Sequence, residues 1–204
     1  MPDTLHLTDD DVRDLGDGDA VIRDGLLLSA DLRSCADTLG ALSDDGRMRP
    51  SGMGRGRVRD SALRGDRIAW RDDLEDVALP GLAALFEGVR AELNAAAWLG
   101  LASFSVQLAV YRGEGARYAR HRDTVAGDRV RRATAVVYLN PDWVLADGGC
   151  LRIHTRYGAR DVEPLGGRTV LFLSDRLEHE VLPCHAVRWA ATAWFRGYDA
   201  EHQG

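Results

Sequence analysis

SFSVQLAVYRGEGARYARHRD, residues 103–123, marks the point where the periodicity of the chain changes from helical to two. Apolar and polar residues alternate up to Tyr111, which is typical of a strand with one buried face. The glycine-rich stretch 113–115 then indicates a turn, and a second strand follows with His121 and Asp123 at its end. A strand, a turn and a strand therefore open a β-rich second half.

Six further short segments of strand character follow, separated by turn clusters such as ADGG and PLGG. They are ATAVVYLN (133–140), GCLRIHT (149–155), RDVEP (160–164), GRTVLFLSD (167–175), HEVLPC (179–184) and RWAATAWFRG (188–197). About eight strands preceded by helices predict an α+β fold. We expect a double-stranded β-helix, or jelly roll, backed by N-terminal helices.

The first hundred residues carry two helical patterns and a loop. Residues 25–42 place Leu32, Leu39 and Leu42 on one face, with Ser29 as the expected N-cap. Residues 79–100 form a second helix that begins near a proline. Its expected buried residues are Leu82, Leu85, Phe86, Val89 and Leu93.

Residues 47–66 are rich in Gly and Arg and have no apolar period, which predicts a mobile loop, with a short strand at 68–72 after it. The first twenty residues and the last few are expected to fray. The 204 residues suit a single domain. Residues 1–100 would supply the helices and the loop at 47–66, and residues 101–198 the jelly roll.

Composition excludes several classes of function. All 26 basic residues are Arg, so Schiff-base chemistry and the phosphate-binding lysines of kinases and P-loop proteins are impossible. The net charge of −6 gives no basis for binding nucleic acid or an anionic membrane. Three widely spaced cysteines without a CxxC pair and an acidic N-terminus without a secretion signal predict a cytoplasmic location.

Four residues of the second half combine into a candidate site: His121, Asp123, His179 and Arg188. Side chains at i and i+2 of a strand share a face, so His121 and Asp123 can bind one metal. Two imidazoles and one carboxylate with open positions are the ligands of mononuclear non-haem Fe(II). Arg188 shares a face with Thr192 and Trp194, and an inward Arg on an apolar strand needs an anion.

Several motifs then resemble one family in the right order: YRGEGARYARHRD, YLNPDW, GGCLRI, LFLSDRLEHEV and RWAATAWF, with LRGDRIAW at 63–70 ahead of them. Over roughly residues 60–198 the chain resembles the 2-oxoglutarate/Fe(II)-dependent prolyl 4-hydroxylases. Within that family it is most similar to the hypoxia-inducible-factor prolyl hydroxylases and their bacterial homologues. The stretch between Asp123 and Tyr138 is one residue longer than in the family, and the 47–60 loop is richer in Arg and Gly.

The resemblance implies a role for each matching residue. His121, Asp123 and His179 would be the catalytic iron ligands, and Arg188 with Tyr138 would hold the far carboxylate of 2-oxoglutarate. The co-substrate pocket would also be lined by Tyr111, Val136, Leu151, Val181, Thr192 and Trp194. Asp66, near the hinge of the 47–66 loop, and Arg129 would contact the substrate.

The resemblance also implies the reaction. A prolyl residue of a protein or peptide would be hydroxylated, with dioxygen consumed, succinate and CO2 released, and ascorbate as an accessory reductant. In a bacterium the partner would be a protein such as a translation factor, and the enzyme would act as a monomer without nucleic acid or membrane.

The same residues allow other interpretations. His121-Arg122-Asp123 spells the start of a kinase catalytic loop, but the following Asn, the DFG motif and the strand Lys are missing. RWAATAW lacks the second Arg of the nucleic-acid repair branch, and the absence of Lys excludes the lysine-anchored branch. Two alternatives stay open: hydroxylation of free proline or another small molecule, and a non-catalytic, cupin-like metal sensor.

Overall fold

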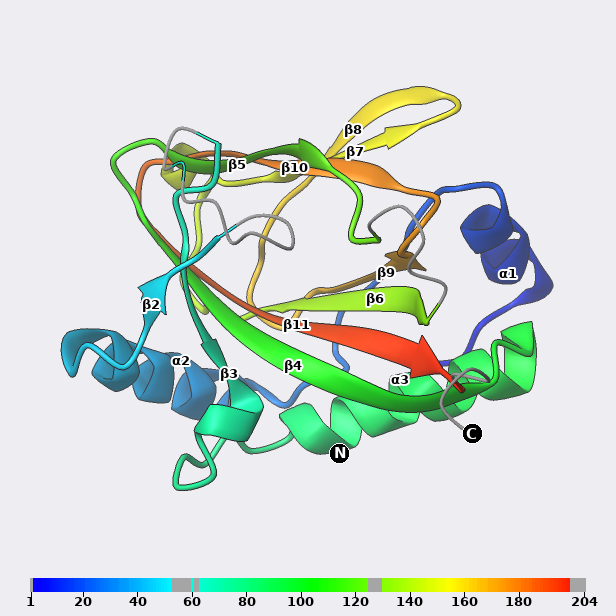
Figure 1. The fold of residues 1–204 in the computed structure, drawn as a ribbon, viewed down its shortest axis with the longest axis horizontal. Helices are drawn as coiled ribbons and strands as arrows, with labels where there is room; N and C mark the ends of the chain where they lie inside the picture. Colours follow the sequence, from blue (N-terminus) through cyan, green and yellow to red (C-terminus); the bar gives the residue numbers. More distant parts are fainter. Residues whose placement is uncertain (1, 53–59, 61–62, 125–129, 199–204) are drawn as a thin grey trace, which may run out of the picture.

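The fold is a two-sheet β structure with helices on one outer face, seen here in a computed structural model (Figure 1). The structure describes residues 2–52, 60, 63–124 and 130–198. The helices are α1 Asp9–Gly16, α2 Ser29–Asp44 and α3 Leu82–Ala97, with 3-10 turns at Arg71–Asp73 and Leu145–Asp147. The strands are β1 Val21–Arg23, β2 Arg49–Pro50, β3 Arg67–Trp70, β4 Leu101–Arg112, β5 Ala116–His121, β6 Arg131–Tyr138, β7 Leu151–Thr155, β8 Gly158–Val162, β9 Thr169–Leu173, β10 Glu178–Cys184 and β11 Val187–Gly197.

The strands form two antiparallel sheets. The larger has the order β1-β9-β6-β11-β4-β3-β2, and the smaller has the order β5-β10-β7-β8. Figure 1 shows the small sheet facing the large one, while α2 and α3 lie on the other side of the large sheet. The expected double-stranded β-helix with N-terminal helices is confirmed, and so are all eight strands that alternation predicted from residue 103 onward.

Alternating side chains of the large sheet divide the core into two layers. On β6, Ala135 and Val137 pack in the cluster that includes the helices, whereas Val136 and Tyr138 pack in the cluster between the sheets. The long strand β11 repeats this pattern, with Ala191 on the helix side. A strand buried on both faces explains why ATAVVYLN reads as a nearly continuous apolar run.

The helices match the sequence prediction in place and differ in detail. All five expected residues of α3 are buried, and the short strand expected at 68–72 is β3. The expected cap of α2 was wrong: Leu28 is the N-cap, without a side-chain hydrogen bond, and Ser29 is the first helical residue.

The expectation that the first twenty residues fray was also wrong. Residues 9–16 form α1, which a capping box between Thr8 and Asp11 stabilises and which buries Leu15. The strand β1 then pairs with β9, so residues 21–23 join the edge of the large sheet. No helix of the described ranges is long and apolar enough to cross a membrane.

Strand register brings the predicted site residues together. His121 on β5 lies opposite His179 on β10 in the small sheet. Arg188 on β11 lies opposite Tyr111 on β4 in the large sheet. Since the two sheets face each other, residues far apart in the sequence meet between them.

Candidate active site: a metal centre beside an anion pocket

The side chains of His121, Asp123 and His179 converge between the sheets. One ligand atom from each lies within 4.8 Å of the others. The Nε2 atoms of His121 and His179 lie 3.7 and 3.8 Å from Oδ1 of Asp123. The sequence predicted Asp123 on the same strand as His121. In the structure β5 ends at His121, and Asp123 lies in the bend that follows, where its carboxylate is still beside His121.

Backbone carbonyls fix the orientation of both imidazoles. Nδ1 of His121 lies 2.8 Å from the carbonyl of Ala119, and Nδ1 of His179 lies 3.3 Å from that of Leu177. A carbonyl only accepts, so each Nδ1 carries the proton and each Nε2 presents a lone pair toward Asp123. Such support from neighbouring groups is typical of metal-binding histidines.

The carboxylate of Asp123 is held in the same way. The hydroxyl of Thr134 on β6 donates to Oδ2 of Asp123 at 2.7 Å, which leaves Oδ1 for the centre of the site. The Thr134 hydroxyl also contacts that of Ser174 at 2.8 Å, and both residues are fully buried. The carboxylate is thus directed by a side chain that does not itself face the metal position.

The charge states of His179 and Asp123 suit metal binding. Burial lowers the pKa of His179 to about 4, against the opposing effect of Asp123, so its imidazole is neutral near pH 7. Burial alone raises the pKa of Asp123, but His179, His121 and the Thr134 hydrogen bond together hold it well below its usual range. A neutral imidazole and an ionised carboxylate are the forms that ligate a metal ion. The donor set therefore fits Fe(II).

The second half of the site is a buried cation. Arg188 is 3% exposed, and its Nε donates to the carbonyl of Gly149 at 2.8 Å. The rings of Tyr111 and Tyr138 each lie 5.0 Å from its guanidinium carbon. Among the residues described, no carboxylate forms an ion pair with Arg188. A buried guanidinium without an anionic partner is costly, so this position is built for an anionic ligand.

The hydroxyl of Tyr138 points to the same ligand. It is fully buried and has no hydrogen-bond partner among the described residues. Burial raises the pKa of Tyr138 to about 12, against the opposing charge of Arg188, so the phenol keeps its proton and remains a donor. A buried donor without an acceptor beside a buried cation fits a carboxylate of 2-oxoglutarate.

Gly149 is required at this position. Its φ of +74° lies in the region that favours glycine, and a Cβ there would come within 2.8 Å of both Cδ of Arg188 and Sγ of Cys184. The ADGG cluster, which the sequence indicated only as a turn, therefore also makes room for the guanidinium.

One pocket of about 490 Å³, its open side included, joins the two halves of the site. Nearly all the predicted site residues line it: His121, Asp123, His179, Arg188, Tyr111, Val136, Leu151, Val181, Thr192, Trp194 and Asp66. Tyr138 does not line the pocket but stands behind it beside Arg188. Arg129 and residues 53–59 and 61–62 of the 47–66 loop lie outside the described residues, and the loop also contains the short strand β2 that the sequence did not predict.

Sequence reasoning missed three polar side chains of the pocket: Arg64, Gln107 and Tyr118. Arg64 forms an ion pair with the buried Asp66 and lies 4.4 Å over the ring of Tyr118. The alternation of SFSVQLAVY could have indicated Gln107, because it shares a face with Tyr111.

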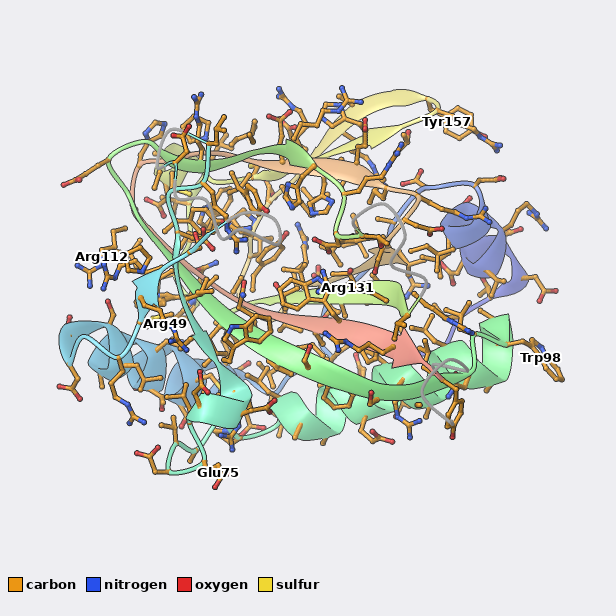
Figure 2. All side chains as sticks on the ribbon, in the orientation of Figure 1. Arg49, Glu75, Trp98, Arg112, Arg131 and Tyr157 are labelled. Atoms are coloured by element: carbon orange, nitrogen blue, oxygen red, sulfur yellow. The ribbon has the colours of Figure 1, made fainter. Side chains whose placement is uncertain are left out.

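A fourth missed residue, Arg131, lies next to the metal ligands. Its Nη1 donates to the carbonyl of Asp123 at 2.6 Å, and its guanidinium lies 4.6 Å over the ring of Trp194. Figure 2 shows Arg131 in the space between the two sheets, whereas Trp98, Tyr157 and Glu75 lie at the periphery. The resemblance indicated Arg129, which lies two residues earlier in the chain.

Comparison with known proteins identifies the family. The sequence profile of the 2OG-Fe(II) oxygenase superfamily matches residues 106–196, which contain all three metal ligands and Arg188. A Pseudomonas putida prolyl-4-hydroxylase structure is 33% identical, with a TM-score of 0.80 over 92% of this chain and 97% of that one. The chain belongs to the 2OG-Fe(II) oxygenase superfamily. The cluster of His121, Asp123 and His179 lies within the matched residues and fits the Fe(II) site that the superfamily's description names.

Two further relatives come from animals. A Trichoplax adhaerens prolyl hydroxylase, solved with a hypoxia inducible factor oxygen degradation domain peptide fragment, is 28% identical, with a TM-score of 0.81 over 91% of this chain and 87% of that one. Egl nine homolog 1 of Homo sapiens is 34% identical over 179 residues, which are 82% of this chain. The chain matches 41% of the length of that relative.

Proposed function

We propose that this oxygenase hydroxylates a prolyl residue in a protein or peptide and converts 2-oxoglutarate and dioxygen to succinate and CO2. The observation that carries the proposal is the meeting of a His-Asp-His cluster and an unpaired, buried Arg188 in one pocket. The similarity to prolyl hydroxylases from bacteria and animals supports the choice of substrate class.

The protein would contribute to the chemistry by positioning the metal ion and by keeping water out of the site. His121 and His179 would hold Fe(II) through Nε2, and Asp123 through Oδ1, with Thr134 keeping the carboxylate in place. When bound, the iron supplies the activation of dioxygen that couples decarboxylation of 2-oxoglutarate to hydroxylation. The apolar lining from Val136, Leu151 and Val181 would exclude water from this chemistry.

Arg188 and Tyr138 would orient 2-oxoglutarate from its far end. The guanidinium offers a charge-assisted contact to the distal carboxylate, and the Tyr138 hydroxyl donates a further hydrogen bond. Among the described residues no carboxylate pairs with Arg188 and no acceptor meets the Tyr138 hydroxyl, so the ligand would complete these contacts. Trp194 and Thr192 lie farther along β11 on the same face, where the substrate would enter.

Mass spectrometry of peptide libraries tests the proposal. Terminally blocked peptides with a central proline, incubated with Fe(II), 2-oxoglutarate and air, should gain one oxygen on proline and release succinate in equal amounts. The Asp123→Ala variant is the control and should give neither product. Hydroxylation of free proline alone would replace the proposal with the small-molecule alternative, and the absence of any succinate from the unaltered protein would favour the metal sensor.

The compartment and the assembly state stay proposals. Three free, buried cysteines are consistent with a reducing compartment such as the cytoplasm, where the sequence placed the protein.

A further inference from the structure

Gln107 is a buried polar side chain whose carboxamide faces the active-site pocket. It lies on β4, is 5% exposed, and sits opposite Thr192 of β11 and Trp70 of β3. Ala109 and Tyr111 follow on the same face of β4, and both also line the pocket. A buried amide needs hydrogen-bond partners, so the contacts of the Gln107 carboxamide indicate its role.

The orientation of this carboxamide is fixed by Arg64. Nη2 of Arg64 donates to Oε1 of Gln107 at 3.1 Å. A guanidinium has no acceptor, so the amide oxygen must face Arg64 and the NH2 group must face away from it. Asp66 holds Arg64 through contacts of 2.8 and 3.0 Å, which makes this arrangement rigid.

The NH2 group of Gln107 is left without a partner among the described residues, and it is not sealed in the core. Buried side-chain atoms without a hydrogen bond include the Tyr138 hydroxyl and the Trp194 indole nitrogen, but not Nε2 of Gln107. The nitrogen therefore reaches the open volume of the pocket and can donate two hydrogen bonds there.

Gln107 lies too far along the sheet to serve 2-oxoglutarate at Arg188. In the strand register Tyr111 lies opposite Arg188, and Gln107 lies opposite Thr192. Gln107 is therefore four residues away from Tyr111 along β4. At about 3.3 Å per residue this is a separation of about 13 Å, which is longer than a five-carbon diacid. Gln107 thus serves the part of the pocket that the substrate occupies.

The chemistry of a prolyl residue matches a donor at this position. Proline has no backbone N–H, so the amide that precedes the target ring offers a carbonyl acceptor and no donor. We propose that Nε2 of Gln107 donates a hydrogen bond to a backbone carbonyl beside the target proline and so holds the peptide in one orientation. This inference rests on the proposed function and adds a substrate-binding residue to it.

Two substitutions test whether Gln107 donates a hydrogen bond to the peptide or only holds Arg64 in place. Gln107→Glu keeps the shape and an oxygen for Arg64 but removes the donor, whereas Gln107→Leu removes both. Ser103→Ala, an exposed position on the same strand, is the matched control. The probe is the best terminally blocked proline peptide from the library, labelled with fluorescein, and its binding is measured by anisotropy without oxygen in the presence of Fe(II) and 2-oxoglutarate.

We expect both Gln107 variants to weaken peptide binding about tenfold, which corresponds to ~1.4 kcal/mol, while Ser103→Ala binds normally. The KM for 2-oxoglutarate should change less than the peptide affinity, because Gln107 pairs with Thr192 and not with Arg188 in the strand register. Normal peptide affinity in Gln107→Glu would overturn the inference, because it would show that the amide only holds Arg64. Failure of the unaltered protein to hydroxylate any proline peptide would instead refute the proposed function.

A thioamide peptide identifies the acceptor. Replacing the carbonyl oxygen on either side of the target proline by sulfur weakens its hydrogen bonds. At one of the two positions, the unaltered protein should lose affinity and Gln107→Glu should show no further loss, since coupled groups are not additive. Equal losses in both proteins at both positions would contradict the proposed contact.

Discussion

Thr134→Val tests whether the residues behind the metal ligands determine the iron site. The substitution keeps the shape of the side chain and removes the hydroxyl that donates to Oδ2 of Asp123 at 2.7 Å. A hydrogen bond to a charged group contributes about 1.5–3 kcal/mol, so the metal-free protein should lose that much stability toward denaturant. The released carboxylate should also leave its orientation toward the metal, which costs about 10- to 100-fold in metal affinity.

Calorimetric titration of the metal-free protein with Fe(II) under anaerobic conditions measures the affinity. Thr134→Ser retains the hydroxyl and should bind iron nearly normally. Thr155→Val removes a half-buried hydroxyl that bonds to Gly158 and Tyr157 in the turn after β7, so it should lower stability but leave the Fe(II) affinity unchanged. Iron affinity within twofold of normal in Thr134→Val, despite reduced stability, would refute the idea that this hydroxyl orients Asp123.

Four further substitutions address the rest of the site. Asp123→Ala should abolish succinate release. Normal release would show that Asp123 is not a metal ligand. Arg188→Ala should weaken 2-oxoglutarate binding by about 2–5 kcal/mol and so raise its KM. An unchanged KM would mean that another group holds the carboxylate. Tyr138→Phe should weaken 2-oxoglutarate binding by about 0.5–1.5 kcal/mol yet leave ligand-free stability unchanged or higher, because its buried hydroxyl has no partner; a loss of stability in denaturant unfolding would contradict this. Gly149→Ala should raise the KM for 2-oxoglutarate, since a Cβ meets Arg188, and a normal KM would show that the guanidinium can shift without consequence.

The β half of the fold could be predicted because its burial follows the pleat. Residues of β6 and β11 pack alternately on the helix side and between the sheets, and both faces are buried, so these strands were visible as apolar runs bounded by turn residues. The two-residue period of a strand then indicated the shared face of Arg188 and Thr192. The two longer helices were equally clear from their apolar stripes.

The N-terminus was less predictable because α1 is short and depends on a local cap. Its capping box uses Asp11 in the position where Glu or Gln is the usual residue, and its one buried residue, Leu15, gives no periodic signal. The edge strand β1 is three residues long and is defined by pairing with β9, which no local pattern reveals.

The metal ligands could be found from the sequence, but the residues that orient them could not. A His-x-Asp motif is visible in the chain, whereas Thr134 is one of many strand threonines until the fold brings it to Asp123. Arg64 likewise sits in a Gly- and Arg-rich loop, and only the structure shows that it pairs with Asp66 and directs Gln107. Contacts between distant segments carry this information, and single-sequence patterns do not contain it.

Anaerobic titration with Fe(II) and 2-oxoglutarate is the most direct test of the central claim, that three side chains and one buried guanidinium hold a metal and a diacid in a single pocket. The account predicts a visible charge-transfer band that needs both components, is absent in Asp123→Ala, and requires far more 2-oxoglutarate in Arg188→Ala. A protein that binds Fe(II) but gives no band at any 2-oxoglutarate concentration would contradict the account.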